Sequence, residues 1–490
     1  MNSYHIFYFP FKWENKKMKD RLFAEQTDLS AIPVNPYANW LRNPGPLNET
    51  EKEQLYNEKN FFYEFVHPVL YDNGGKDSII YHYERQEPQQ RDVSYIISVK
   101  DKTYQLKVEA INLNLYVTGV GTLIFYLANH LKNQWEPDDI LKINQYGRRI
   151  FPPFYADIEG RSETANYIQI KGLNGDPTLY KEDFSSYEIH PETWKPACFI
   201  KNLILDLSED IEITPAIDDR MFVNCWYGNN SLANFFKNDD ETLEHFFLDK
   251  KETNDFWYKY IYVDVSSPSC TNEDMRKSLL KSQTNKRWQK EGTLFGMSRY
   301  SFVCLTEESW IPKNIVAVHM RTMYSRIVEL ILVQRASRLR FSDEVTRQVS
   351  TLPKRKGLEP LVLEHVNSLH KEYIRFLNQI HFSEVTAQDQ GIELYNLLYE
   401  TLSIEKHIKE LDEEIAELDQ YINLIDDKIR NKNAEILNYI AIIFLPASLF
   451  YAFFNIGCEP YTNLKILLIG IGGLTLSLIM FLLLKIFKNK

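Results

Sequence analysis

The sequence predicts an α/β cytoplasmic domain followed by a long helical, coiled-coil-like stalk and a C-terminal two-helix transmembrane hairpin. Three observations predict this fold class: two uncharged runs near the C-terminus, a heptad repeat before them, and alternating strand-like and helix-like segments earlier in the chain. The expected organisation is a ligand-sensing domain at 1–315, a stalk at 316–435, the hairpin at 436–484 and a basic cytoplasmic tail at 485–490.

The two C-terminal runs have the length that crosses a bilayer. Ile436–Cys458 gives 23 consecutive residues without a charged side chain, and Ile466–Leu484 gives another 19. About 20 mostly apolar residues match a hydrocarbon core of roughly 30 Å. The joining segment, Glu459–Lys465, is too short for anything but a hairpin turn between two spans. A pair of buried core helices is the alternative, and we expect the membrane hairpin.

Flanking cations set the expected orientation. They lie outside the two runs, at Lys428, Arg430 and Lys432 and at Lys485, Lys488 and Lys490. Because short cytoplasmic flanks carry the excess of Lys and Arg, both ends of the chain are expected to face the cytoplasm. No basic leader precedes an apolar run at the N-terminus, so we expect no signal peptide. The predicted localisation is the bacterial inner membrane, in a multi-pass topology.

Composition excludes several classes of function. The net charge of −11 argues against a nucleic-acid-binding surface, so no direct nucleic-acid partner is expected. Five cysteines without a CxxC pair indicate reduced thiols, with neither a disulfide framework nor a zinc site. HExxH, GxSxG and protein-kinase signatures are missing from the sequence, so we expect no catalysis. No cofactor is predicted, although a nucleotide ligand or a divalent cation fits the segments described below.

A heptad seam precedes the first uncharged run. Apolar residues alternate at spacings of four and three, at Ile404, Ile408, Leu411, Ile415, Leu418, Ile422, Ile425 and Ile429. No Gly or Pro lies between Thr401 and Leu445, so one helix of roughly 80 Å should run from the stalk into the first span. The alternative is an amphipathic helix packed on a domain. Further helices are expected at His319–Val349 and Leu361–Leu398.

The first 315 residues alternate between strand-like and helix-like segments. Strands are predicted at Tyr4–Phe11, Ser94–Val99, Tyr104–Val108, Ile111–Val117, Phe199–Leu205, Phe222–Trp226, Tyr260–Val265 and Tyr300–Leu305. Helices are predicted at Gly121–Lys132, Leu232–Phe236 and Glu241–Phe247.

Two short segments in this domain have the chemistry of an anion or nucleotide site. Arg148 and Arg149 follow a turn-like Gly, and Arg is the preferred residue for bidentate phosphate contacts. Asp218 and Asp219 precede Arg220 at the start of a predicted strand, where an acidic pair can hold ribose hydroxyls, an amine or a divalent ion. A salt-bridge network inside the fold is the competing interpretation, and it is the favoured one for each segment taken alone. A third segment, Gly292–Tyr300, is a weaker candidate for a phosphate-binding turn.

The first uncharged run also has a stripe of small and polar residues, which predicts a pore lining. The stripe consists of Asn431, Ala434, Leu437 or Asn438, Ala441, Leu445, Ser448, Ala452 and Asn455. Leu445 would form a hydrophobic gate that works by dewetting, and Gly457 and Glu459 would lie at the outer mouth. A dry interface between neighbouring helices is the alternative. We expect the pore, because water would satisfy the Asn side chains at both ends of the stripe.

These features resemble the CorA-type two-transmembrane superfamily of ion transporters. Ile440-Ala441, Ile443-Phe444 and Pro446 are similar to the family's Ile-Ala-x-Ile-Phe-x-Pro run, and Glu459 lies where members carry acidic residues. The family's Gly-Met-Asn motif is replaced by Asn455-Ile456-Gly457. The resemblance covers about Ile404 to Lys490 and implies a homopentamer in a lipid bilayer, with the first span lining a central pore and the second facing lipid.

The chain looks most like the CorA-type membrane effectors associated with type III CRISPR systems. That resemblance implies a ligand-gated ion channel acting in antiviral defence. It would open when a nucleotide second messenger, such as an S-adenosylmethionine–AMP conjugate, binds the cytoplasmic domain. A divergent transporter of Mg²⁺ or another divalent cation is the first alternative. A membrane-anchored scaffold whose spans only tether it is the second.

Overall fold

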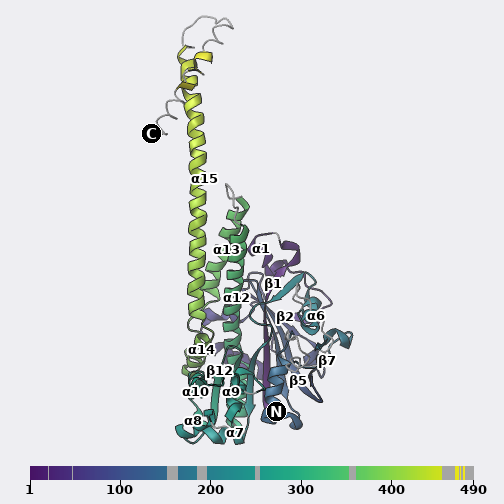
Figure 1. Cartoon of the computed structure of the whole chain (residues 1–490). Helices are drawn as coiled ribbons and strands as arrows, with labels where there is room; N and C mark the ends of the chain where they lie inside the picture. Colours follow the sequence, from purple (N-terminus) through teal and green to yellow (C-terminus); the bar gives the residue numbers. More distant parts are fainter. Residues whose placement is uncertain are drawn as a thin grey trace. The chain divides into compact units, whose positions relative to one another are not determined.

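The computed structural model describes most of the chain, and Figure 1 labels its helices and strands in sequence order. The described residues are 1–19, 21–46, 48–151, 164–184, 196–248, 254–266, 268–351, 360–454, 470–473, 475 and 478–479. The described chain divides into two compact units. Unit 1 comprises Met1–Arg347 and Glu364–Ile415, and unit 2 comprises Gln348–Leu363 and Ala416–Lys490.

The thirteen described strands form one mixed sheet. They are β1 (Ser3–Asn15), β2 (Trp40–Arg42), β3 (Ile80–Arg85), β4 (Ser94–Val99), β5 (Lys102–Tyr116), β6 (Val120–Asn129), β7 (Tyr167–Lys171), β8 (Lys181–Asp183), β9 (Ile211–Pro215), β10 (Phe222–Gly228), β11 (Thr284–Asn285), β12 (Thr293–Met297) and β13 (Ser301–Thr306). The main path is β11-β12-β13-β10-β1-β6-β5-β4-β7-β8, with β9 beside β1, β3 beside β5 and β2 beside β3. The β10–β13 pair is parallel and the other described pairs are antiparallel.

The described helices occur between the strands and in a run after β13. They are α1 (Phe23–Gln26), α2 (Glu49–Phe61), α3 (His67–Leu70), α4 (Glu87–Gln90), α5 (Pro137–Gly147), α6 (Cys198–Leu207), α7 (Asn230–Phe236), α8 (Asp240–Leu248), α9 (Asn254–Tyr262), α10 (Glu273–Ser282), α11 (Ala317–Arg321), α12 (Met323–Thr351), α13 (Pro360–Gln379), α14 (Asp389–Thr401) and α15 (Ile404–Phe454).

Strand β1 lies at the centre of the sheet. One of its edges pairs with β6, and the other pairs first with β10 and then with β9. Pro10 lacks a backbone N–H and cannot donate to a ladder. It lies in the short gap where the neighbouring strand changes from β10, which pairs as far as Tyr8, to β9, which begins pairing at Phe11. A proline is therefore tolerated in a strand that is otherwise fully paired.

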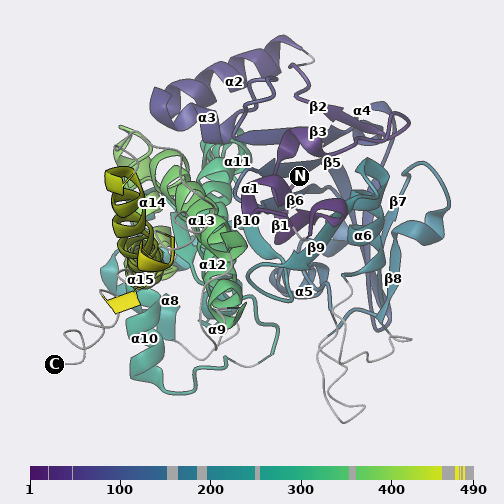
Figure 2. The same ribbon diagram turned by 90° about the horizontal axis from the view of Figure 1, so that it is seen from above.

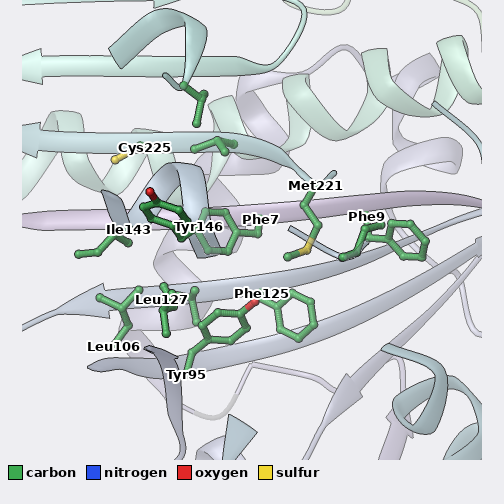
Figure 3. Close-up of a cluster of buried hydrophobic side chains, with 14 of the residues drawn as sticks. Phe7, Phe9, Tyr95, Leu106, Phe125, Leu127, Ile143, Tyr146, Met221 and Cys225 are labelled. Atoms are coloured by element: carbon green, nitrogen blue, oxygen red, sulfur yellow. The ribbon is translucent and has the colours of Figure 1, made fainter. Parts of the chain in front are cut away.

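One face of the sheet is apolar and is covered by α5 and α6. Alternate residues of each strand point to it, as the two-residue period of a strand requires. Phe125 of β6 packs there against Tyr95 of β4 and Phe199 of α6, with ring centroids 5.6 and 6.2 Å away. Figure 3 shows Phe7, Tyr146 and other buried side chains of this core meeting between the strands and α5.

The opposite face of the sheet is polar and carries α12. The carboxylate of Glu329, which is 1% exposed, accepts hydrogen bonds from Asn114 and from the hydroxyls of Tyr116 and Thr122, the two hydroxyl contacts at 2.8 and 3.0 Å. Arg326 donates to the second oxygen of Glu329 at 3.2 Å. Because α6 and α12 contact alternate residues of β6, they lie on different sides of that strand (Figure 2).

The predicted seam lies along α15 and is buried at its start. Ile404 and Ile415 are 2% and 4% exposed in the single chain, and Ile408 and Leu411 between them are buried as well. This part of the seam therefore matches the alternative of an amphipathic helix packed on its own domain. The prediction of an unbroken helix through Leu445 is confirmed, since α15 runs from Ile404 to Phe454.

The predicted membrane hairpin is not found. Among the described residues, none of the helices combines the length and the apolarity needed to cross a bilayer. Lack of charge, on which the prediction relied, is a weaker requirement than predominant apolarity. The apolar end of α15 includes Asn438, Tyr439 and Ser448, and 466–484 is described only in short pieces. On these residues the predicted transmembrane fold class, the membrane-channel description and the inner-membrane localisation are wrong.

Three local predictions in the first 315 residues are also wrong. Gly121–Lys132 was expected as a helix, but most of it forms β6. Strand β6 is paired with β1 on one edge and β5 on the other, and all its residues are buried. Phe199–Leu205 and Tyr260–Val265 were expected as strands, but the first lies in α6 and the second begins in α9. Short apolar runs give the same signal for a buried strand and a buried helix.

The Glu329 contacts predict a large stability loss on substitution. Glu329→Leu would leave Arg326 with Glu58 as its one carboxylate partner among the described residues. It would also remove the acceptor used by the buried donors of Asn114, Tyr116 and Thr122. We expect a loss of about 3–5 kcal/mol in unfolding free energy. Thr346→Leu, on an exposed position of the same helix, should change it by less than about 0.5 kcal/mol. Denaturant unfolding of both variants measures these free energies. Equal unfolding free energies for the two variants would show that Glu329 does not hold α12 on the sheet.

Candidate functional site

Arg148 and Arg149 directly follow helix α5, and their backbone contacts the two residues before strand β10, Arg220 and Met221. Arg148 is the C-cap residue of α5, and its carbonyl accepts the N–H of Met221 at 2.8 Å. Arg149 forms an isolated antiparallel bridge with Arg220. The two segments singled out from the sequence are therefore brought together, although about 70 residues separate them along the chain.

The acidic pair makes ion pairs with two of these arginines. Arg220 lies 3.1 Å from Asp218 through Nη2 and 3.1 Å from Asp219 through Nε. Arg149 Nη1 lies 3.7 Å from Asp219 Oδ2. The competing interpretation from the sequence, an Arg–Asp network inside the fold, is thus present for Arg149 and Arg220. Arg148 makes no ion pair of this kind among the described contacts.

Three further residues from the β12–β13 turn and from α12 complete the site. The ring of Tyr300 lies under two guanidinium groups, with its centroid 5.4 Å from Arg148 Cζ and 5.2 Å from Arg220 Cζ. Burial, then the charge of Arg299, lowers the pKa of Arg335. We call Arg148, Arg149, Arg220, Arg299 and Arg335 the guanidinium cluster.

Arg148 is the most constrained member of the cluster. Its side chain is only 2% exposed, and its Nη2 makes two long contacts of 3.4 Å, to Gln145 Oε1 and to the Val263 carbonyl. Its Nε has no hydrogen-bond acceptor among the described residues. Burial, followed by the charges of Arg220 and Arg149, lowers the pKa of Arg148 to about 9. A buried guanidinium without a carboxylate partner is unfavourable, which makes an external anion an expected partner.

The two aspartates supply less negative charge than their number suggests. Burial, then the hydrogen bond and charge of Asp218, raises the pKa of Asp219 to about 6. For Asp218, burial alone would raise the pKa, but the hydrogen bond with Asp219 and the charge of Arg220 outweigh it and lower the pKa. Two adjacent carboxylates titrate as a coupled pair. The pair therefore does not neutralise the five guanidinium groups around it.

A cavity lies beside the two aspartates, and none of the five arginines belongs to its described lining. This cavity has a volume of about 460 Å³ and is lined by the consecutive residues Thr214–Asp219, which end β9 and lead to Arg220. Its lining combines apolar Pro215 and Ile217 with the two carboxylates. Such a mixture suits a ligand with a ring and polar substituents. The described residues hold no group of three or more His, Cys, Asp or Glu side chains arranged for a metal ion.

A second arginine of α12 connects this region to the start of α15. Arg338 Nε donates to the His407 carbonyl at 3.3 Å, and Arg338 Nη2 lies 3.8 Å from Glu410. Burial, then the charge of Arg338, lowers the pKa of His407, and Arg299 and Arg335 lower it further. The guanidinium cluster is thus electrostatically continuous with the first turns of α15.

Sequence reasoning missed Arg335 and gave little weight to Arg299 and Tyr300. Arg335 follows Gln334, which already ends the buried apolar run Leu330–Val333 on α12, so no break in the sequence pattern marked Arg335 itself. The remaining predicted site residues lie elsewhere. The stripe from Asn431 to Ala452 lies on α15, with Asn431, Ala434, Leu437, Ala441, Leu445, Ser448 and Ala452 exposed in the single chain. Asn455, Gly457 and Glu459 lie outside the described residues.

Comparison with known proteins adds no assignment to this geometry. No protein-family model matches the chain, and no curated protein matches it.

Replacing Arg148 by the uncharged, similarly long Met should not destabilise the ligand-free protein. The change removes a buried charge that has no carboxylate partner, so the melting temperature should stay level or rise. Arg85→Met is the matched control, because Arg85 is fully buried and donates to both oxygens of the buried Glu87 at 2.8 and 2.9 Å. That change should cost about 3–5 kcal/mol. Thermal melts compare the two, and an equally large loss for Arg148→Met would make Arg148 a structural residue.

Proposed function

We propose that this chain is a receptor for a phosphate-bearing, nucleotide-like ligand that binds at the guanidinium cluster, and that it acts by binding rather than by catalysis. The observation that carries the proposal is the state of Arg148. Its guanidinium is buried, has a free Nε donor among the described residues and has a pKa lowered to about 9. An arriving phosphate would remove this unfavourable state.

Phosphate is the anion that this donor set favours. Arg148 after α5, Arg220 before β10 and Arg335 of α12 share Asp218 and Tyr300 as charge neighbours, and guanidinium forks match the oxygens of a phosphate. Arg335 Nη1 is a second donor without an acceptor among the described residues. The cavity beside Asp218 and Asp219 leaves room for a ring and a sugar. The carboxylates of these two residues would accept hydrogen bonds from the hydroxyl groups of the sugar.

The response to ligand would pass through α12 and α15. Arg335 and Arg338 lie one turn apart on α12, and Arg338 contacts the first turns of α15. A ligand that draws Arg335 toward its phosphate changes the charge around His407 and Glu410. For this to act as a signal, the ligand must bind one arrangement of these helices better than another.

The channel and transporter functions expected from the sequence are not part of this proposal. Both need membrane-spanning helices, which the described residues do not provide. The receptor function needs only unit 1, where all members of the guanidinium cluster lie.

Nucleotide binding by single variants tests the proposal. Calorimetry with AMP and with adenosine should show that only AMP binds the wild-type protein measurably. Arg148→Met should weaken AMP binding by about 10- to 100-fold, because a charge-assisted hydrogen bond contributes about 1.5–3 kcal/mol. Arg287→Gln is the control, since Arg287 is partly exposed and paired with Asp389 and Glu393. It should bind AMP as the wild type does. Equal affinity for adenosine and AMP, or unchanged AMP binding by Arg148→Met, would reject the site.

The raised pKa of Asp219 predicts a pH dependence. As the pH falls through about 6, Asp219 takes up a proton and the cluster becomes more positive. The affinity for sulfate, whose charge is constant in this range, should therefore rise at least about threefold between pH 7.5 and pH 5. Folding raises the pKa of Asp219, so the folded protein holds this proton more tightly than the unfolded chain does. The contribution of Asp219 to the free energy of unfolding therefore falls as the pH rises from about 4 to 6.

Asp219→Asn separates this effect from titration of His407. The variant should bind sulfate tightly at both pH values and show a flatter affinity profile, with the stability slope also reduced. If the variant keeps the full wild-type pH dependence, Asp219 is not the group responsible.

A further inference from the structure

A second polar cavity lies on the α12 face of the sheet, away from the guanidinium cluster. It has a volume of about 560 Å³. Three parts of unit 1 line it: the start of α2, residues of strands β1, β5 and β6, and the junction between α11 and α12. Figure 2 shows α2 and α11 on the same side of the β-strands. None of the residues proposed above for phosphate binding lines it.

A β-bulge places a carboxylate in this cavity. The register between β5 and β6 shifts between Val108 and Ala110, so Glu109 is the extra residue on β5. A bulge redirects a side chain that regular pleating would place elsewhere. Glu109 accepts a hydrogen bond from Tyr4 at 2.8 Å and lies in the cavity wall.

A break between two helices places a guanidinium opposite this carboxylate. Helix α11 ends at Arg321, and Thr322 has φ −109° and ψ −99° before α12 begins at Met323. Arg321 Nη1 lies 3.3 Å from Glu109 Oε2, and its Cζ lies 5.2 Å from the ring centroid of Tyr4. The cavity therefore presents one anion and one cation side by side.

A buried acceptor in the cavity wall has no donor. Asn112 is 8% exposed, and its Oδ1 has no hydrogen-bond partner among the described residues. Unsatisfied buried polar atoms are rare in native structures, and each one needs an explanation. By contrast, Asn48 and Glu51 on the opposite wall are already bonded to each other through the N-cap of α2. Asn112 is thus the polar wall residue that needs a ligand N–H.

We propose that this cavity binds a free α-amino acid, with its ammonium group between Asn112 Oδ1 and Glu109 and its carboxylate on Arg321. In an α-amino acid the ammonium group and the carboxylate are attached to the same carbon, so the two charged groups are close enough together to match an adjacent Glu–Arg pair. Glu109 and Arg321 can both keep charge-assisted hydrogen bonds when the zwitterion enters. The ammonium group would bind Glu109, and the carboxylate would bind Arg321. Tyr4 and Tyr126 supply aromatic surface beside the ammonium.

The charges around the cavity argue against an anionic ligand such as a phosphate. Among the described residues that line the cavity, Arg321 is the one Arg or Lys, and it is already balanced by Glu109. Glu51 adds a second carboxylate to the lining. A dianion would meet more negative than positive charge there, whereas a zwitterion meets both signs.

Binding of common L-α-amino acids to the full-length protein tests this proposal. Calorimetry should find at least one that binds with a Kd below about 1 mM. The amide of the same amino acid, which lacks the carboxylate, should bind the wild type about tenfold more weakly. Arg321→Gln should bind the acid and the amide equally, because the group that distinguishes them is gone. Arg287→Gln should behave as the wild type.

Asn112→Leu provides the second arm. It removes the acceptor for the ammonium, so amino-acid affinity should fall about tenfold or more, while the ligand-free melting temperature does not fall. Retained preference for the acid over the amide in Arg321→Gln would overturn the proposal. So would full affinity in Asn112→Leu, or the failure of every free amino acid to bind the wild type.

Discussion

The buried carboxylate of Glu329 is the constraint on which the rest of the structure depends. It gathers donors from β5, β6 and its own helix, and so fixes α12 on the polar face of the sheet. An apolar helix–sheet contact tolerates sliding, but a carboxylate with four donors specifies one register. Because α12 is fixed there, its break from α11 places Arg321 in the cavity proposed to bind an amino acid. Further along the same helix, Arg335 enters the guanidinium cluster and Arg338 reaches α15.

The two proposed sites share one physical signature, a buried polar atom that has no hydrogen-bond partner among the described residues: Arg148 Nε in the first and Asn112 Oδ1 in the second. Arg85 shows what a purely structural buried arginine looks like here, with carboxylates on both sides of its guanidinium. Arg148 makes no such ion pair with the described residues, and the charges of Arg220 and Arg149 act on it instead. Folding stability is sacrificed at such a position, and a ligand that supplies the missing partner recovers it. The same reasoning applies, with an uncharged amide, to Asn112.

The sequence predicted some features of this protein and failed on others for identifiable reasons. The arginine and aspartate segments were found because unusual side chains follow turn signals, and the structure joins them through the bridge between Arg149 and Arg220. The continuous helix α15 was found because a long stretch without Gly or Pro is a strong local signal. Strand β6 was mistaken for a helix, since the continuous apolar run Leu123–Ala128 at its centre has no period that separates a strand from a helix. Arg335 and the bulge at Glu109 depend on tertiary pairing, which no local pattern records.

A structure of the full chain determined with AMP tests the central claim most directly, because it shows which acceptor Arg148 uses. The account predicts the AMP phosphate within hydrogen-bonding distance of Arg148 Nε, with Arg220 or Arg335 on another phosphate oxygen and the ribose beside Asp218 and Asp219. A structure in which AMP binds elsewhere, or in which a protein carboxylate or carbonyl accepts from Arg148 Nε while AMP is bound, would contradict it.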